Sequence, residues 1–416
     1  MQEIYELFKK YGAMMASQGY ELGEEARIVL DTYEGVYGTK KGANLANLRW
    51  KDIVKMSDNH FGNGKSGMIA RVISQTPYCQ KCLEEGFDIP AVLDDMAQIV
   101  GPKAALVNVS DGSKKSALKM AKAISQSSGI LVQDRVRDGK PAGYTLTVGR
   151  SLYEAVVAMT VLEKSAEIYI KARAVGGAKP ISKWESMKMR NFYMEKYSKS
   201  EQDLKAAESA KGRLMEEEEE EGMDLQWSEK EALGRQQLVE YGNKLVETGL
   251  VQGTWGNLSY RIDDQYMLVT PSGMDYARLT PADMVKVNIH TLDHEGTLKP
   301  TSEKGIHGSI YKNRPEVGAV IHTHSKYCAV FASAVKDMPI VGEEAKAVFG
   351  DKIAVAKHAG PGTDKLMKYT VSALGDNYGC LMANHGMVAC GADMETAFEH
   401  CCMLETSGEA YINERL

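Results

Sequence analysis

The chain has 416 residues and a formal net charge of −6, with 44% hydrophobic and 25% charged residues. This length predicts two domains, each able to bury a core of its own. The mildly acidic balance argues against a nucleic-acid or membrane-surface partner, and no run of 18 apolar residues predicts a transmembrane helix. Seven cysteines, an odd number at low density, argue against a disulfide framework, so we expect a cytoplasmic protein.

An acidic segment divides the chain. Residues 183–235 are rich in Lys, Glu, Met, Ala and Ser, and they include six consecutive glutamates, Glu216 to Glu221. Such a block repels itself and cannot pack in a core, which predicts an acidic helical linker at 196–226. We therefore place one domain at 1–195 and a second at 227–416.

Short matches recur in the same order in the two halves. Tyr11-Gly12 matches Tyr241-Gly242, and Leu162-Glu163 matches Leu404-Glu405 in a long helical pattern. The offset changes along the chain, as insertions in loops would produce. These matches predict a diverged tandem duplication.

The second half alternates short strands and helices. Helices are expected at 228–249, 302–313, 325–335, 364–374 and 393–413, and strands at 257–262, 266–270, 317–325, 379–384 and 386–390. Neighbouring hairpins indicate a mostly antiparallel sheet with helices on its faces.

Eight of the nine histidines lie after residue 289. His322 and His324 end an apolar strand, and because side chains alternate along a strand they point to the same face. Two imidazoles on one face suit Zn²⁺, although a hydrogen-bonded histidine pair would look the same. His385, in a tight Asn-His-Gly turn, offers a third ligand. Three protein ligands leave one zinc position open, as in a catalytic site.

Three small polar segments could converge on a phosphate. Thr301-Ser302-Glu303 opens the helix expected at 302–313, where free N–H groups bind anions well. The same residues are also an ordinary helix cap. The other two segments are Gly253–Ser259 and Thr270–Gly273, which would be simple turns if taken singly.

Together these motifs make residues 228–416 resemble the class II aldolase/adducin family, which includes zinc-dependent L-fuculose-phosphate aldolases and ribulose-phosphate 4-epimerases. The resemblance implies an α/β fold of two tandem three-layer α/β/α domains, each with a central, mostly antiparallel sheet. It also implies a homo-oligomer, a dimer or tetramer of tandem chains, with active sites where domains meet.

The resemblance also assigns roles to individual residues. His322, His324 and His385 would hold one Zn²⁺ per chain, for which Mn²⁺, Fe²⁺ or Co²⁺ could substitute. Glu303 would be the acid/base carboxylate. His358 stands where fuculose-phosphate aldolase has a proton-donating tyrosine, although a surface histidine is the alternative. The residues implied to bind the substrate phosphate are Thr254, Asn257, Ser272, Gly273, Thr301 and Ser302.

The implied activity is retro-aldol cleavage of a small phosphorylated ketose, similar to fuculose 1-phosphate, to dihydroxyacetone phosphate and an aldehyde. Glu303 favours cleavage, because the epimerases tend to have Asp at this position. The alternatives are a sugar-phosphate 4-epimerase, a related decarboxylase or dehydratase, and a non-catalytic adducin-like assembly protein. The first half reads Val72 to Pro77 at the His-x-His strand and Asp134 to Val136 at the histidine turn. We therefore expect a degenerate first copy that lacks metal ligands.

Overall fold

The computed structural model describes residues 1–18, 22–56, 69–196 and 227–416. Contacts divide the chain into two compact units, Met1–Ile170 with Pro180–Met223, and Lys171–Lys179 with Asp224–Leu416. The predicted linker, apart from its first residue, lies outside the described residues. Within the described ranges, no helix is long and apolar enough to cross a membrane.

The second unit is built on a seven-stranded sheet of order β12-β11-β10-β13-β18-β17-β16. The strands are β10 (Gly256–Arg261), β11 (Tyr266–Val269), β12 (Val285–Asn288), β13 (Ala319–Thr323), β16 (Val355–Ala356), β17 (Gly379–Met382) and β18 (Gly386–Gly391). The helices are α7 (Glu229–Glu247), α8 (Lys304–Asn313), α9 (Lys326–Ala334), α10 (Glu343–Phe349), α11 (Asp364–Leu374) and α12 (Met394–Asn413). The short strands β14 (Met338–Pro339) and β15 (Lys352–Ile353) form a separate pair.

The sheet is mixed, which corrects the expectation of a mostly antiparallel one. β16 pairs in parallel with β17, whereas the pairs from β12 to β17 are antiparallel. The parallel pair arises because α11 connects these two strands and returns the chain to the same end of the sheet, as a crossover helix does.

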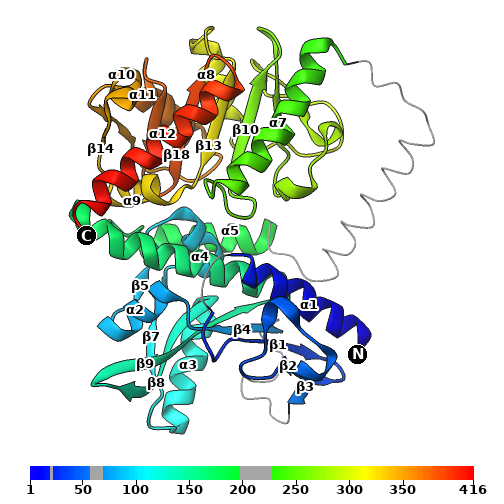
Figure 1. The fold of residues 1–416 in the computed structure, drawn as a ribbon, viewed down its shortest axis with the longest axis vertical. Helices are drawn as coiled ribbons and strands as arrows, with labels where there is room; N and C mark the ends of the chain where they lie inside the picture. Colours follow the sequence, from blue (N-terminus) through cyan, green and yellow to red (C-terminus); the bar gives the residue numbers. More distant parts are fainter. Residues whose placement is uncertain (19–21, 57–68, 197–226) are drawn as a thin grey trace. The chain divides into compact units, whose positions relative to one another are not determined.

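Helices cover both faces of this sheet. On one face, Ile306 and Ile310 of α8 and Leu366 of α11 join a core cluster with sheet residues such as Val269 and Val388. On the other face, α12 packs on β18 and β13, and α7 packs on β10 (Figure 1). The result is a three-layer α/β/α arrangement whose central strands are buried.

Polar caps set where several of these helices begin. Ser228, Thr363 and Asp393 each accept a hydrogen bond from a backbone N–H three residues later. Each cap satisfies a donor that the first helical turn would otherwise leave unpaired. The helices predicted from 228, 364 and 393 accordingly begin at Glu229, Asp364 and Met394.

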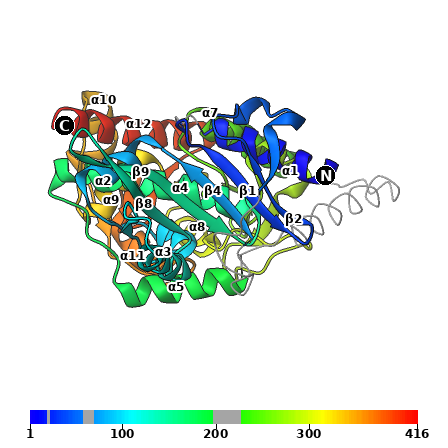
Figure 2. The same ribbon diagram turned by 90° about the horizontal axis from the view of Figure 1, so that it is seen from below.

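The first unit has a seven-stranded sheet of order β3-β2-β1-β4-β9-β8-β7, shown in part in Figure 2. The strands are β1 (Arg27–Thr32), β2 (Gly35–Thr39), β3 (Ile53–Met56), β4 (Ala70–Ser74), β7 (Leu106–Asn108), β8 (Gly129–Arg137) and β9 (Lys140–Gly149). The helices are α1 (Gln2–Ala16), α2 (Pro77–Glu85), α3 (Lys114–Gln126), α4 (Leu152–Lys171) and α5 (Lys183–Lys196). This sheet is mixed as well, because β7 and β8 pair in parallel.

The hairpins at matching places in the two sheets differ in length. In the second unit the last pair of β17 and β18 is Met382 with Gly386. In the first unit, pairing of β8 with β9 continues to Arg137 with Lys140, and the chain turns at Asp138-Gly139 with positive φ at both residues. Asp134 to Val136 therefore lie within β8, and not at a turn as expected when the two halves of the sequence were matched.

Candidate metal and acid–base site

His322 and His324 come from the end of β13. His322 pairs with Val388 of β18, and His324 follows the strand, just before α9. Both side chains are buried, and their Nε2 atoms lie 2.9 Å apart. The strand alternation thus brings the two rings to one face, as the sequence predicts.

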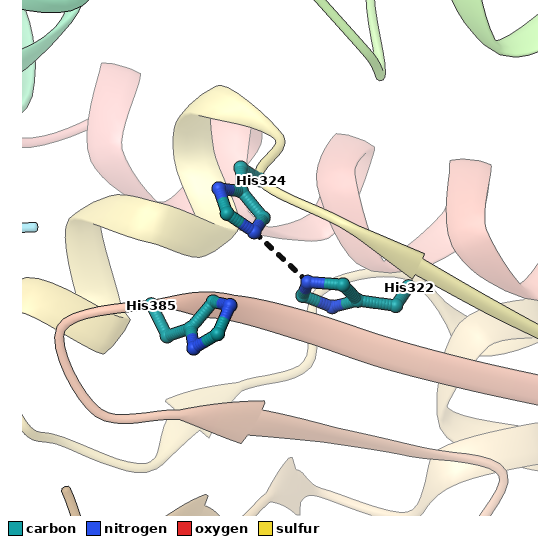
Figure 3. A group of neighbouring side chains, drawn as sticks. All are labelled: His322, His324 and His385. Atoms are coloured by element: carbon teal, nitrogen blue, oxygen red, sulfur yellow. Dashed lines mark hydrogen bonds between the residues drawn. The ribbon is translucent and has the colours of Figure 1, made fainter. Parts of the chain in front are cut away.

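His385 joins this pair from the tight turn between β17 and β18. The backbone N–H of His385 donates to Met382 O at 3.0 Å, and Asn384 before it has a positive φ of 57°. One ligand atom from each of His322, His324 and His385 lies within 4.8 Å of the other two (Figure 3). The structure therefore gathers all three predicted metal ligands into one buried cluster.

The cluster fits a small divalent cation. Zn–N bonds of the usual length at a tetrahedral angle place two ligand nitrogens roughly 3.3 Å apart, close to the spacing of the His322 and His324 Nε2 atoms. His322 Nδ1 donates to Met387 O at 2.7 Å, which leaves its Nε2 with the lone pair that binds metal. Burial lowers the pKa of His322 to about 3, so its ring is neutral at pH 7.

Glu303 lies beside the histidines. It is the N-cap of α8, but its side chain caps no backbone N–H, and α8 begins at Lys304 rather than at residue 302. Its carboxylate instead lies 3.1 Å from His322 Nε2 and 3.2 Å from His385 Nε2. Burial opposes its charge, but the three histidines and the Asn257 amide outweigh burial and lower the pKa of Glu303 to about 2. The hydrogen bond from the Asn257 amide favours the carboxylate form of Glu303.

A buried chain of hydrogen bonds leads away from Glu303. The Asn257 amide N–H donates to Glu303 Oε2 at 3.1 Å, and Asn257 Oδ1 lies 2.6 Å from His307 Nε2. His307 Nδ1 lies 2.7 Å from Ser259 Oγ, which is 2.7 Å from the Tyr311 hydroxyl. Burial lowers the pKa of His307 to about 4, so this ring is neutral and can donate at Nε2 while accepting at Nδ1.

This series of hydrogen bonds was not predicted from the sequence, although the spacing of its residues is visible there. His307 follows Glu303 by four residues at the start of a predicted helix, so both lie on one side of it. Ser259 follows Asn257 by two residues in a predicted strand, so both point to one face. The two patterns together would have predicted a polar contact between the strand and the helix.

Two of the three predicted phosphate segments lie side by side. The backbone N–H of Ser272 donates to Lys299 O at 2.9 Å, and that of Thr301 donates to Thr270 O at 3.1 Å. Gly362, from the segment before α11, also lies against Ser302. Ser272, Gly273 and Ser302 are exposed, Thr254 is half-buried, and Thr301 and Asn257 are buried.

Asn257 has less capacity for a phosphate than expected. Its oxygen faces His307, and one of its two N–H bonds is directed at Glu303, so a single N–H remains for another acceptor. His358 is half-buried between β16 and α11 and does not belong to the histidine cluster. The phosphate-binding and proton-donating roles of these residues stay predictions.

The comparisons with known proteins point to the second unit. Residues 236–412 match the class II aldolase and adducin N-terminal domain. The chain is 34% identical over 177 residues to a 5-methylthioribulose-1-phosphate/5-deoxyribulose-1-phosphate aldolase of Rhodospirillum rubrum, covering 42% of this chain and 79% of that protein. It is 32% identical over 184 residues to the L-fuculose phosphate aldolase of Escherichia coli K12, covering 44% of this chain and 84% of that protein.

The chain belongs to the class II aldolase/adducin family. A solved structure of an L-fuculose 1-phosphate aldolase is 34% identical, covers 44% of this chain and 85% of its own, and has a TM-score of 0.42. The matched family domain contains the three histidines, Glu303 and every predicted phosphate residue.

Proposed function

We propose that the second unit is a divalent-metal-dependent aldolase that cleaves a small phosphorylated ketose to dihydroxyacetone phosphate and an aldehyde. The observation that carries this proposal is the contact of the Glu303 carboxylate with two of the three clustered histidines. Burying a carboxylate beside three imidazoles costs free energy, and groups buried at such a cost cluster at functional sites, which favours an enzyme over an assembly protein.

His322, His324 and His385 would hold the metal. A divalent ion bound there supplies a Lewis acid for the negative charge that develops on substrate oxygens during cleavage. Zn²⁺ suits three imidazole ligands, and Mn²⁺, Fe²⁺ or Co²⁺ could replace it.

Glu303 would move the proton on carbon. In the condensation direction its carboxylate removes a proton from the carbon of dihydroxyacetone phosphate that forms the new bond. In the cleavage direction the same group returns that proton to the carbon released from the broken bond. The Asn257 amide holds the carboxylate in place through its 3.1 Å hydrogen bond.

Phosphorylated ketoses are the proposed substrates for two reasons. The relatives include aldolases named for ribulose and fuculose phosphates. In this chain, the turn around Ser272 lies next to Thr301 and Ser302 at the start of α8, whose N-terminal dipole favours an anion. A phosphate bound there would anchor the end of the substrate that does not react and fix its geometry.

We further propose that the first unit is a degenerate copy of the same domain. The two seven-stranded sheets have the same strand order, with the parallel pair at the same edge. Ile73 of β4 pairs with β9 where His322 of β13 pairs with β18, and the histidine turn is replaced by the longer β8–β9 hairpin. On this proposal the first unit binds no metal.

Individual contacts repeat in the two units and support the same proposal. Glu163 accepts hydrogen bonds from the backbone of Tyr78 and Cys79, at 2.7 and 2.9 Å. Glu405 accepts the equivalent bonds from Tyr327 and Cys328, also at 2.7 and 2.9 Å. The pairs of Lys103 with Asp88 and Lys352 with Asp337 repeat in the same way.

The function is tested by incubating the full chain with a panel of ketose 1-phosphates and measuring the dihydroxyacetone phosphate released, with and without a chelator. We expect release from at least one panel member, loss with the chelator, and recovery when Zn²⁺ is added back. Conversion of a pentose phosphate to its 4-epimer without release of a triose phosphate would favour the epimerase. Metal-loaded protein that turns over no panel member would contradict the aldolase assignment.

A further inference from the structure

A short segment from before the family domain packs beside the metal cluster. Lys171–Lys179 follows α4 in the sequence, but its contacts assign it to the second unit. The Lys171 ammonium donates to the Tyr327 hydroxyl at 3.3 Å and lies 4.4 Å from the centroid of the Tyr327 ring. At the other end, the backbone N–H of Lys179 donates to Ser333 O at 2.8 Å. The segment therefore contacts both the first and the last turn of α9, the helix that directly follows His322 and His324.

The histidine turn is attached to the same place. The backbone N–H of Asn384 donates to Ala332 O at 3.0 Å, near the end of α9. The Asn384 side-chain N–H donates to Lys179 O at 2.8 Å. Asn384 directly precedes His385, so one residue ties the third ligand both to α9 and to the segment.

Asn384 also has an unusual backbone conformation. Its φ of 57° lies in the left-handed region, which asparagine tolerates better than most residues but which still costs free energy. Interactions around the residue must hold it there. The backbone bond to Ala332 is available to any residue at this position, whereas the bond to Lys179 requires a side-chain donor.

We propose that Lys171–Lys179 is a brace for the metal site. The carbonyl of Lys179 fixes the Asn384 side chain, and this fixes the direction of His385 relative to His322 and His324. Asn384 is a positioning residue, and the inference rests on the proposed metal site. The brace lies outside residues 236–412, which match the family domain.

Loss of an outer hydrogen bond that orients a metal ligand typically lowers metal affinity about 10–100-fold. Asn384→Asp keeps the shape of the side chain and its tolerance of the left-handed region, but places an oxygen against the Lys179 carbonyl. Asn384→Gly keeps the backbone conformation and removes the side chain. Both variants therefore test the bond to Lys179 separately from the turn itself.

Asn377 provides a matched control at the other end of β17. Its side-chain N–H also donates to a backbone carbonyl, Phe349 O, at 2.8 Å. Its oxygen accepts from the backbone of Tyr378 and Gly379, and an aspartate would keep these bonds. Asn377→Asp thus removes the same kind of donor without touching the histidine turn.

The experiment measures the affinity of the full chain for Zn²⁺ by competition with a chromophoric chelator. We expect about 10–100-fold weaker binding in Asn384→Asp and Asn384→Gly, and wild-type affinity in Asn377→Asp. Wild-type affinity in both Asn384 variants, or an equal loss in Asn377→Asp, would overturn the brace.

Amide hydrogen exchange of the metal-free protein separates this inference from the proposed function. Residues 380–390 should exchange faster in both Asn384 variants than in the wild type. If the wild type binds no Zn²⁺ but this difference is found, the metal site fails and the brace of the turn stands. Unchanged exchange would overturn the brace even if the protein proves to be an aldolase.

Discussion

Glu303 and His322 lie in direct contact, with Glu303 Oε2 only 3.1 Å from His322 Nε2. The two residues come from different elements, the start of α8 and the end of β13. The contact places a carboxylate beside the nitrogen that would bind the metal.

Replacing this carboxylate should separate catalysis from metal binding. In Glu303→Gln the side chain keeps its size but can no longer take up or return a proton. We expect the rate of dihydroxyacetone phosphate release to fall about 10²–10⁴-fold, while the metal content measured by mass spectrometry stays at one ion per chain. Glu343→Gln, at a carboxylate that is almost fully exposed, should leave both quantities unchanged. A Glu303→Gln enzyme with the wild-type rate would remove Glu303 from the mechanism.

The metal should bind only in the second unit. We expect one Zn²⁺ per wild-type chain and none in His324→Ala, because two imidazoles hold the ion far less tightly than three. His294→Ala removes an exposed histidine outside the cluster and should retain the metal. Two ions per wild-type chain would contradict the proposed degeneracy of the first unit.

Gly386 allows the histidine rings to meet. A Cβ at this position would lie 2.3 Å from Thr323 O and 3.1 Å from both His322 Cε1 and His324 Cδ2. Gly386→Ala should therefore displace the cluster and weaken Zn²⁺ binding by at least about tenfold, as chelator competition would measure. Gly360→Ala is the control, because its Cβ would meet nothing closer than 3.9 Å. Equal affinities in the two variants would show that the ring positions tolerate this contact.

His307 should make the stability of the second unit depend on pH. Burial lowers its folded-state pKa to about 4, below the unfolded value of about 6.5. Above pH 6.5 His307 is neutral in both the folded and the unfolded chain, so it does not affect the free energy of unfolding. As the pH falls from 6.5 to 4, the unfolded chain binds a proton that the folded one does not. This costs about 2 kcal/mol of unfolding free energy at pH 5.

Denaturant unfolding at pH 7 and pH 5 would measure this effect. In His307→Gln the loss of stability between the two pH values should be smaller than in the wild type by about 2 kcal/mol. The same pH dependence in the variant and the wild type would mean that His307 is not buried as a neutral ring.

Glu163 and Glu405 make the same contacts in the two units, so they should stabilise the starts of α2 and α9 equally. Glu163→Ala would leave the backbone N–H groups of Tyr78 and Cys79 without their acceptor, and Glu405→Ala would do the same at α9. Each variant should lower the free energy of local opening at its helix start by about 1–3 kcal/mol, as amide exchange would measure. An effect of Glu163→Ala on the start of α9 but not on that of α2 would contradict the assignment of Glu163 to the start of α2.

Local sequence patterns predicted much of the structure of the second unit. Strand alternation was enough to place His322 and His324 on one face, and the predicted helix at 364–374 has the same bounds as α11. The parallel β16 was missed because a two-residue strand has no periodicity to detect. The hydrogen bond of Asn257 to Glu303 joins residues 46 positions apart. Glu303 reaches β10 because the segment before it is bonded to the end of β11, through the Thr301 N–H and Thr270 O.

If the first unit is a degenerate copy, as we propose, its longer hairpin decides how a histidine triad could be built there. The substitutions Ile73→His and Gln75→His would place two imidazoles at the end of β4. A third cannot be restored by exchanging one residue for another, because beyond Val132 and Tyr144 the strands β8 and β9 continue for four more paired positions before they turn. Regaining the third histidine would require a deletion that removes those pairs and rebuilds a tight turn with a left-handed residue. On the proposal of a degenerate copy, single-residue exchanges alone would therefore not rebuild the histidine triad in the first unit.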